Sequence, residues 1–124
     1  MQDPQVLVAG AGPVGQFAAL ALARRGVPVE IADTGIWPCK HSYALALHPQ
    51  TIRLLEGYGL QEEILAEAYP VRTIGLYDKS GRRGGITLGD PADPTACLAV
   101  LRQDFIENML MQTRRSHIEN RSRA

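Results

Sequence analysis

The chemistry of this chain is concentrated in a glycine-rich segment near its beginning and in one acidic residue that follows. Gly10, Gly12 and Gly15 form the pattern G-x-G-x-x-G, and Asp33 stands eighteen residues after the last of them. In this pattern the first glycine allows a tight turn, the second lets a phosphate approach the backbone, and the third lets a helix pack closely on a strand. An acid placed like Asp33 accepts hydrogen bonds from ribose hydroxyls. The segment therefore predicts a site for a pyrophosphate-bridged nucleotide.

The surrounding sequence predicts the strand–helix–strand unit that such a site requires. Residues 5–9 are a nearly continuous apolar run, typical of a buried parallel strand. Residues 13–25 predict a helix, and residues 27–32 predict the second strand. Agreement with the full fingerprint extends along the unit to Gly15, Ala19, Leu22, Gly26, Val29, Ile31 and Asp33. The alternative, a glycine-rich turn in an α/β unit that binds nothing, explains fewer of these positions.

The start of the expected helix supplies the groups that would hold phosphate. Pro13 suits a first helical turn, where its missing N–H has no cost. We expect the free N–H groups around Val14 and Gly15 to bind phosphate oxygens with help from the helix dipole. An acid at position 33, rather than a basic residue, disfavours a ligand with a 2′-phosphate and therefore disfavours NADP.

The rest of the chain predicts further short elements. These are two helices, an antiparallel hairpin, an extended run and a last helix, at residues 49–57, 61–68, 71–77 with 86–88, 96–101 and 102–111. Residues 113–124 are rich in Arg, Ser and Asn, which predicts a basic, disordered tail. The fold class expected is α/β, with one partial domain over residues 1–112.

Several segments beyond the glycine loop carry a family resemblance. Residues 42–51 read Ser-Tyr-Ala-Leu-Ala-Leu-His-Pro-Gln-Thr, and residues 101–110 read Leu-Arg-Gln-Asp-Phe-Ile-Glu-Asn-Met-Leu. Together with the loop, the Leu-Leu and Gly-Leu pairs within residues 54–60 and the hairpin, they resemble the flavin-dependent aromatic hydroxylases, the p-hydroxybenzoate hydroxylase-like FAD monooxygenases. The likeness covers roughly residues 5–112.

The resemblance implies a Rossmann-like βαβ segment that binds FAD, followed by a hairpin that begins the substrate-side sheet. The cofactor-binding positions it implies are Gly10, Ala11, Gly12, Pro13, Val14, Gly15, Asp33, Thr34, Tyr43, Arg102 and Gln103. Either Arg102 or Gln103 would lie near the flavin side of the pyrophosphate. Tyr43 departs from the family, which usually has an arginine there that contacts FAD, so we expect weaker cofactor binding.

The family reaction is hydroxylation of an aromatic substrate with NAD(P)H and O2. The sequence supplies no residue that we name as catalytic, and it lacks the later Asp-Gly and Gly-Asp motifs of the family. We therefore expect an incomplete, N-terminal segment without turnover of its own, either a truncated product or one part of a split protein with a complementing chain. The alternatives are a non-catalytic nucleotide-binding module, a non-functional truncated product and a fragment of an NAD-dependent dehydrogenase.

Composition narrows the remaining function classes. The chain has 124 residues and a formal net charge of zero, which gives no reason to expect nucleic acid or a membrane surface as partner. The first residues do not resemble a signal peptide, so a cytoplasmic location is expected. Cys39 and Cys97 are then expected to be reduced thiols. The three histidines have no partners at metal-ligand spacing, and we predict no metal site.

Overall fold

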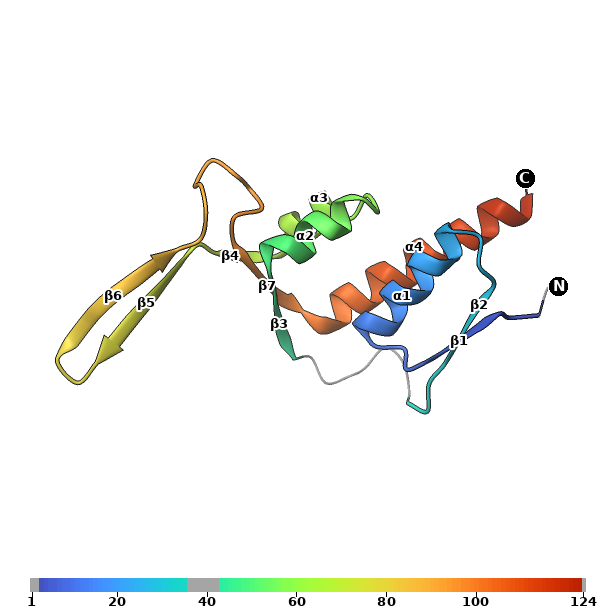
Figure 1. The fold of residues 1–124 in the computed structure, drawn as a ribbon, viewed down its shortest axis with the longest axis horizontal. Coiled ribbons are helices and arrows are strands. Elements are labelled where there is room, and N and C mark those ends of the chain that lie inside the picture. The colour runs from blue at the N-terminus through green and yellow to red at the C-terminus, as the bar shows by residue number, and fades with distance from the viewer. Residues whose placement is uncertain (1–2, 36–42, 124) are drawn as a thin grey trace. The chain divides into compact units, whose positions relative to one another are not determined.

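The computed structural model in Figure 1 describes residues 3–35 and 43–123. These residues form two compact units. The first combines the described residues of Met1–Tyr43 and Arg102–Ala124, and the second is Ala44–Leu101. The glycine loop, Asp33 and every other predicted cofactor-binding position belong to the first unit.

The first unit contains the predicted strand–helix–strand arrangement. It consists of β1 (Val6–Ala9), α1 (Pro13–Arg24) and β2 (Val29–Ala32). The two strands pair in parallel, with Val6 opposite Val29, which confirms the βαβ prediction. The N–H of Gly10 extends the pairing by donating to the carbonyl of Ala32 at 2.7 Å. The glycine loop therefore begins beside the end of β2, where Asp33 follows.

A second helix, α4 (Gln103–Arg123), packs along α1, and the two run side by side in Figure 1. Their buried apolar side chains make up the core of the unit: Ala19, Leu20, Ala23, Ile106, Met109 and Leu110. The strands, by contrast, alternate between half-buried and exposed positions, and Leu7 is 64% exposed. The expectation of a strand buried throughout is therefore wrong for this unit, since only one face of β1 and β2 is covered.

The prediction of a disordered tail is also wrong for the described residues, because α4 continues to Arg123. Residues 103–123 contain no glycine or proline that would end a helix. Two contacts from the last turns of α4 join it to the end of α1: Arg121 Nη1 donates to the carbonyl of Ala23 at 3.3 Å, and His117 Nε2 lies 3.2 Å from the same oxygen. Tertiary contacts thus stabilise a segment whose composition alone favours disorder.

The second unit contains a three-stranded sheet and two short helices. The strands are β3 (Ala44–Leu47), β4 (Tyr69–Val71) and β7 (Leu98–Arg102) in the order β3-β7-β4, with β4 antiparallel to β7. The helices are α2 (Pro49–Glu56) and α3 (Gln61–Glu67), close to their predicted bounds. The buried apolar residues of the unit are Ile52, Leu55, Leu60, Ile64, Ala96, Cys97, Ala99 and Leu101. Cys97 is a free thiol, as predicted, and Cys39 lies outside the described residues.

The predicted antiparallel hairpin is confirmed, with different bounds. It is formed by β5 (Thr73–Asp78) and β6 (Gly81–Thr87). The turn is shorter than expected because Asp78 Oδ1 accepts the N–H of Ser80 at 2.7 Å, which closes it. The run predicted as one strand over 71–77 is divided at Arg72, whose side chain donates to the carbonyls of Asp93 and Ala96. Across residues 3–35 and 43–123, no helix has the length and apolar character needed to cross a membrane.

Candidate nucleotide-binding site

The glycine loop has the geometry that its sequence predicts. Gly10 adopts φ +107°, a conformation that side chains other than glycine rarely accept. A Cβ on Gly15 would lie 2.0 Å from the carbonyl oxygen of Gly10, so α1 approaches the loop more closely than any larger residue permits. A Cβ on Gly12 would meet nothing within 4 Å. The packing of the described residues therefore does not require glycine at position 12 and leaves space beside its backbone.

The first turn of α1 is without a cap. Gly12 occupies the N-cap position, no side chain among the described residues caps the turn, and no acidic residue lies within it. Pro13 has no N–H, and the N–H groups of Val14 and Gly15 have no acceptor within the helix. The Val14 side chain is 84% exposed. An anion placed here would satisfy these donors and interact favourably with the positive end of the helix dipole.

Asp33 faces this turn from the end of β2. Its Oδ2 accepts the N–H of Ala11 at 2.6 Å, and its Oδ1 accepts the N–H of Gly35 at 2.7 Å. These two hydrogen bonds, the one from Ala11 most strongly, hold the pKa of the carboxyl below its ordinary value. The carboxylate is therefore ionised at neutral pH, and its remaining lone pairs can accept from ribose hydroxyls. Thr34, which follows it, is exposed.

Asp33→Asn is expected to lower the stability of the chain at neutral pH and to have a smaller effect in acid. Because the folded-state pKa is depressed, the contribution of Asp33 is present above its unfolded-state pKa and is lost as pH falls through the folded-state value. Urea unfolding of both proteins between about pH 6 and pH 3 measures this contribution. The difference in unfolding free energy should shrink toward the acid end. A difference that stays constant with pH would contradict the role given to the ionised carboxylate.

The other predicted positions form a second hydrogen-bonded group. The N–H of Gln103 donates to the carbonyl of Tyr43 at 3.0 Å, which joins the start of α4 to the segment before β3. The Tyr43 side chain is 66% exposed. Arg102 is bound to its neighbour Asp104 through two hydrogen bonds of 3.0 and 2.6 Å, which hold the pKa of that carboxyl below its ordinary value.

Sequence reasoning missed one residue of this group. Glu107 is only 1% exposed, and its Oε1 accepts a hydrogen bond from Gln103 Nε2 at 2.7 Å. The signal present in the sequence is the spacing of four residues, which places both side chains on one face of a helix. That spacing is common, so the burial of Glu107 could be recognised only from the fold.

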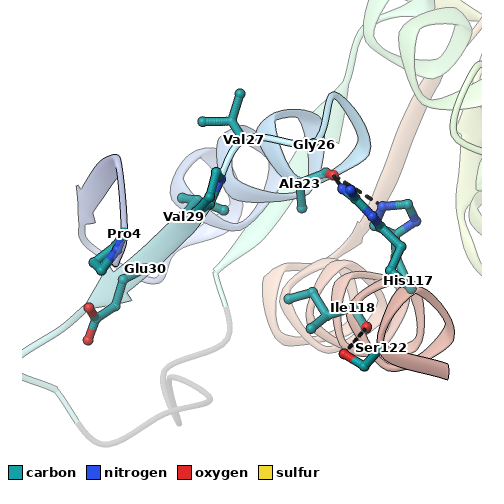
Figure 2. Close-up of a pocket in the computed structure, with 11 residues that line it drawn as sticks. Pro4, Ala23, Gly26, Val27, Val29, Glu30, His117, Ile118 and Ser122 are labelled. Atoms are coloured by element: carbon teal, nitrogen blue, oxygen red, sulfur yellow. Dashed lines mark hydrogen bonds between the residues drawn. The ribbon is translucent and has the colours of Figure 1, made fainter. Parts of the chain in front are cut away.

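A separate cavity of about 540 Å3 lies at the other end of the strands. Figure 2 shows its lining, which includes Pro4 before β1, Gly26 after α1, and His117 and Ile118 of α4. No residue of the glycine loop lines it. In this view His117 points toward the Ala23 carbonyl, so this polar side chain stabilises the end of α1. The cavity is therefore distinct from the candidate site.

The residues of the glycine loop fit the pyrophosphate and ribose of a dinucleotide. The uncapped donors of α1, the open space at Gly12 and the ionised Asp33 each match one part of such a ligand. In the described part of the chain, no group of three or more His, Cys, Asp or Glu side chains could hold a metal ion. Fold and site together define a dinucleotide-binding domain of the Rossmann-like class.

Comparison with known proteins identifies the family. A family model described as "FAD binding domain" matches residues 3–121, and the chain belongs to this family. Similar proteins include 6-methylpretetramide 4-monooxygenase of Streptomyces rimosus, 46% identical over 55% of this chain. Kynurenine 3-monooxygenase of Drosophila melanogaster is 33% identical over 86% of it. The chain is thus an FAD-binding domain of the flavin monooxygenases, which removes the NAD-dependent dehydrogenase alternative.

Solved structures agree with this assignment. p-Nitrophenol 4-monooxygenase of Pseudomonas putida matches 91% of this chain with a TM-score of 0.78 and 25% identity. Anhydrotetracycline hydroxylase of Streptomyces rimosus matches 90% with a TM-score of 0.75 and 27% identity. The match covers 29% and 22% of those chains, and 12% and 24% of the two curated relatives named above. The chain therefore corresponds to a small part of each of these enzymes.

Proposed function

We propose that the chain holds FAD through the glycine loop and Asp33, as the cofactor-binding part of a monooxygenase that hydroxylates an aromatic substrate. The pyrophosphate would lie against the N–H groups of Val14 and Gly15, and the adenosine ribose against Asp33. The observation that carries this proposal is the uncapped first turn of α1, which faces an ionised carboxylate across an open glycine. The aromatic substrate is supported by the names of the relatives, which include aromatic monooxygenases and hydroxylases.

Bound FAD would supply the redox chemistry, with NAD(P)H as reductant and O2 as the source of the transferred oxygen atom. The residues of this chain bind and orient the cofactor, and the surrounding enzyme excludes water. We take Gln103 as the candidate for a contact on the flavin side, because its Nε2 is turned toward Glu107 and its amide oxygen can still accept a hydrogen bond. An NAD(P)H-dependent reaction also favours a cytoplasmic location. The part of the enzyme that binds the aromatic substrate would be supplied by additional residues or by a complementing chain.

Titration of the 124-residue chain with FAD, followed by flavin fluorescence and calorimetry, tests the proposal. We expect saturable binding of one FAD that ADP competes for, because both ligands present a pyrophosphate and an adenosine ribose. Addition of NAD(P)H and a phenol is expected to give no substrate-stimulated oxidation, since this chain covers a small part of its relatives. Absence of FAD binding would overturn the proposed cofactor site. Substrate-stimulated turnover would instead show that the chain is catalytically complete.

A further inference from the structure

A buried carboxylate at the start of α4 has a single hydrogen-bond partner within the described chain. Glu107 is 1% exposed, its Oε1 accepts from Gln103 Nε2 at 2.7 Å, and its Oε2 has no partner among the described residues. A buried charged group is costly unless it is hydrogen-bonded. The Gln103–Glu107 hydrogen bond therefore stabilises the carboxylate and restrains the carboxamide at the same time.

This contact fixes which way the Gln103 carboxamide points. Gln103 Nε2 donates to Glu107 Oε1 at 2.7 Å, so the Nε2 side of the amide faces Glu107 and the amide Oε1, which is an acceptor, faces away. The backbone of Gln103 is held independently, because its N–H donates to the carbonyl of Tyr43 at 3.0 Å. With the backbone held at Tyr43 and the side chain at Glu107, the amide oxygen is presented in one orientation.

We propose that Glu107 is a positioning residue that acts on the cofactor through Gln103. It holds the carboxamide so that the amide oxygen Oε1 faces the bound cofactor and can accept from one of its hydroxyl groups, while the donor Nε2 is turned toward Glu107 and away from the phosphate oxygens. Without Glu107, Gln103 regains its rotamers, and binding must then order a flexible side chain, which weakens the binding. The inference rests on the proposed function, since it needs FAD to lie beside Gln103.

A double-mutant cycle with Glu107→Met and Gln103→Ala tests the proposal. Methionine keeps the length of the side chain and removes the acceptor. We expect E107M to weaken FAD binding about tenfold in the wild-type background, as the rotamer entropy implies, and to have almost no effect in the Q103A background. E107Q retains an acceptor at the same reach and should stay within about threefold of wild type, because the hydrogen bond from Gln103 Nε2 can still form. A role in folding alone would give equal effects of E107M in both backgrounds.

A measurement without cofactor tests the contact directly. In the NMR spectrum of the wild-type chain, the two side-chain amide protons of Gln103 should be well separated, and in E107M they should move to averaged positions. Ile106→Val, a control in the adjacent buried position, should lower stability without changing these signals or FAD affinity. Signals of Gln103 that are the same in wild type and E107M would overturn the positioning role, as would equal effects of E107M in the two binding backgrounds. Loss of FAD binding by the wild-type chain would instead overturn the proposed function.

Discussion

Replacing Gly15 with alanine is expected to destabilise the first unit by about 3 kcal/mol, the upper end of the usual cost of overpacking, because the clash is with backbone. The added Cβ would lie 2.0 Å from the carbonyl oxygen of Gly10 and 3.3 Å from Val8 Cγ1. The first of these atoms belongs to the backbone of a loop that is already fixed by its pairing with β2, so it cannot move aside as a flexible side chain would. Urea unfolding followed by circular dichroism measures the loss.

The same experiment on Gly59→Ala provides a control elsewhere in the chain. Unlike Gly15, which lies in α1, Gly59 has a positive φ, +73°, and a Cβ there would meet nothing within 4 Å among the described residues. G59A therefore reports the cost of backbone conformation without the clash, and G15A should cost clearly more. If the two variants were equally stable, the close approach of α1 to Gly10 would not be the reason for glycine at position 15.

Replacing Gly12 with alanine, unlike the Gly15 replacement, should leave the stability of the fold unchanged. It should instead weaken FAD binding about a hundredfold. Gly12 has φ −67° and ψ −177°, which any residue adopts, and its Cβ would enter open space. The methyl group would occupy the space through which the pyrophosphate reaches the backbone. Loss of two hydrogen bonds to a charged group, at about 1.5 kcal/mol each, corresponds to that change in affinity.

Calorimetry with FAD and thermal unfolding of the same sample test this prediction together. G12A should unfold at the wild-type temperature or slightly above it, because alanine restricts the unfolded chain more than glycine. Wild-type FAD affinity in G12A would contradict the placement of the pyrophosphate. A lower unfolding temperature would mean that Gly12 is needed by the fold as well as by the ligand.

The βαβ unit could be predicted from the sequence because each of its parts depends on local chemistry. The glycines, the proline at the start of α1 and the apolar run of β1 specify turn, helix and strand within a few residues of themselves. Asp33 could be predicted for the same reason, since its place follows from the end of β2. Its hydrogen bond to Ala11 could not, because that contact joins residues 22 positions apart.

The features that sequence reasoning missed depend on partners distant in the chain. The strand β3 has only four residues, Ala44–Leu47, and exists through its pairing with β7. The last turns of α4 are polar, and their order comes from contacts with the end of α1. Glu107 is a charged residue type that is seldom buried, and its burial follows from the folded chain rather than from its sequence neighbours.

The hydrogen bond from Ala11 to Asp33 also has a consequence for the rate of ligand capture. It joins the glycine loop to Asp33 within the chain itself, so in the proposed site the group that would meet the pyrophosphate and the group that would meet the ribose are held together. Binding that needs no ordering of a loop loses little conformational entropy and is not slowed by a preceding rearrangement. We therefore expect the cofactor to bind to a preformed loop. Differences in affinity among loop variants should lie mainly in the dissociation rate rather than in the association rate.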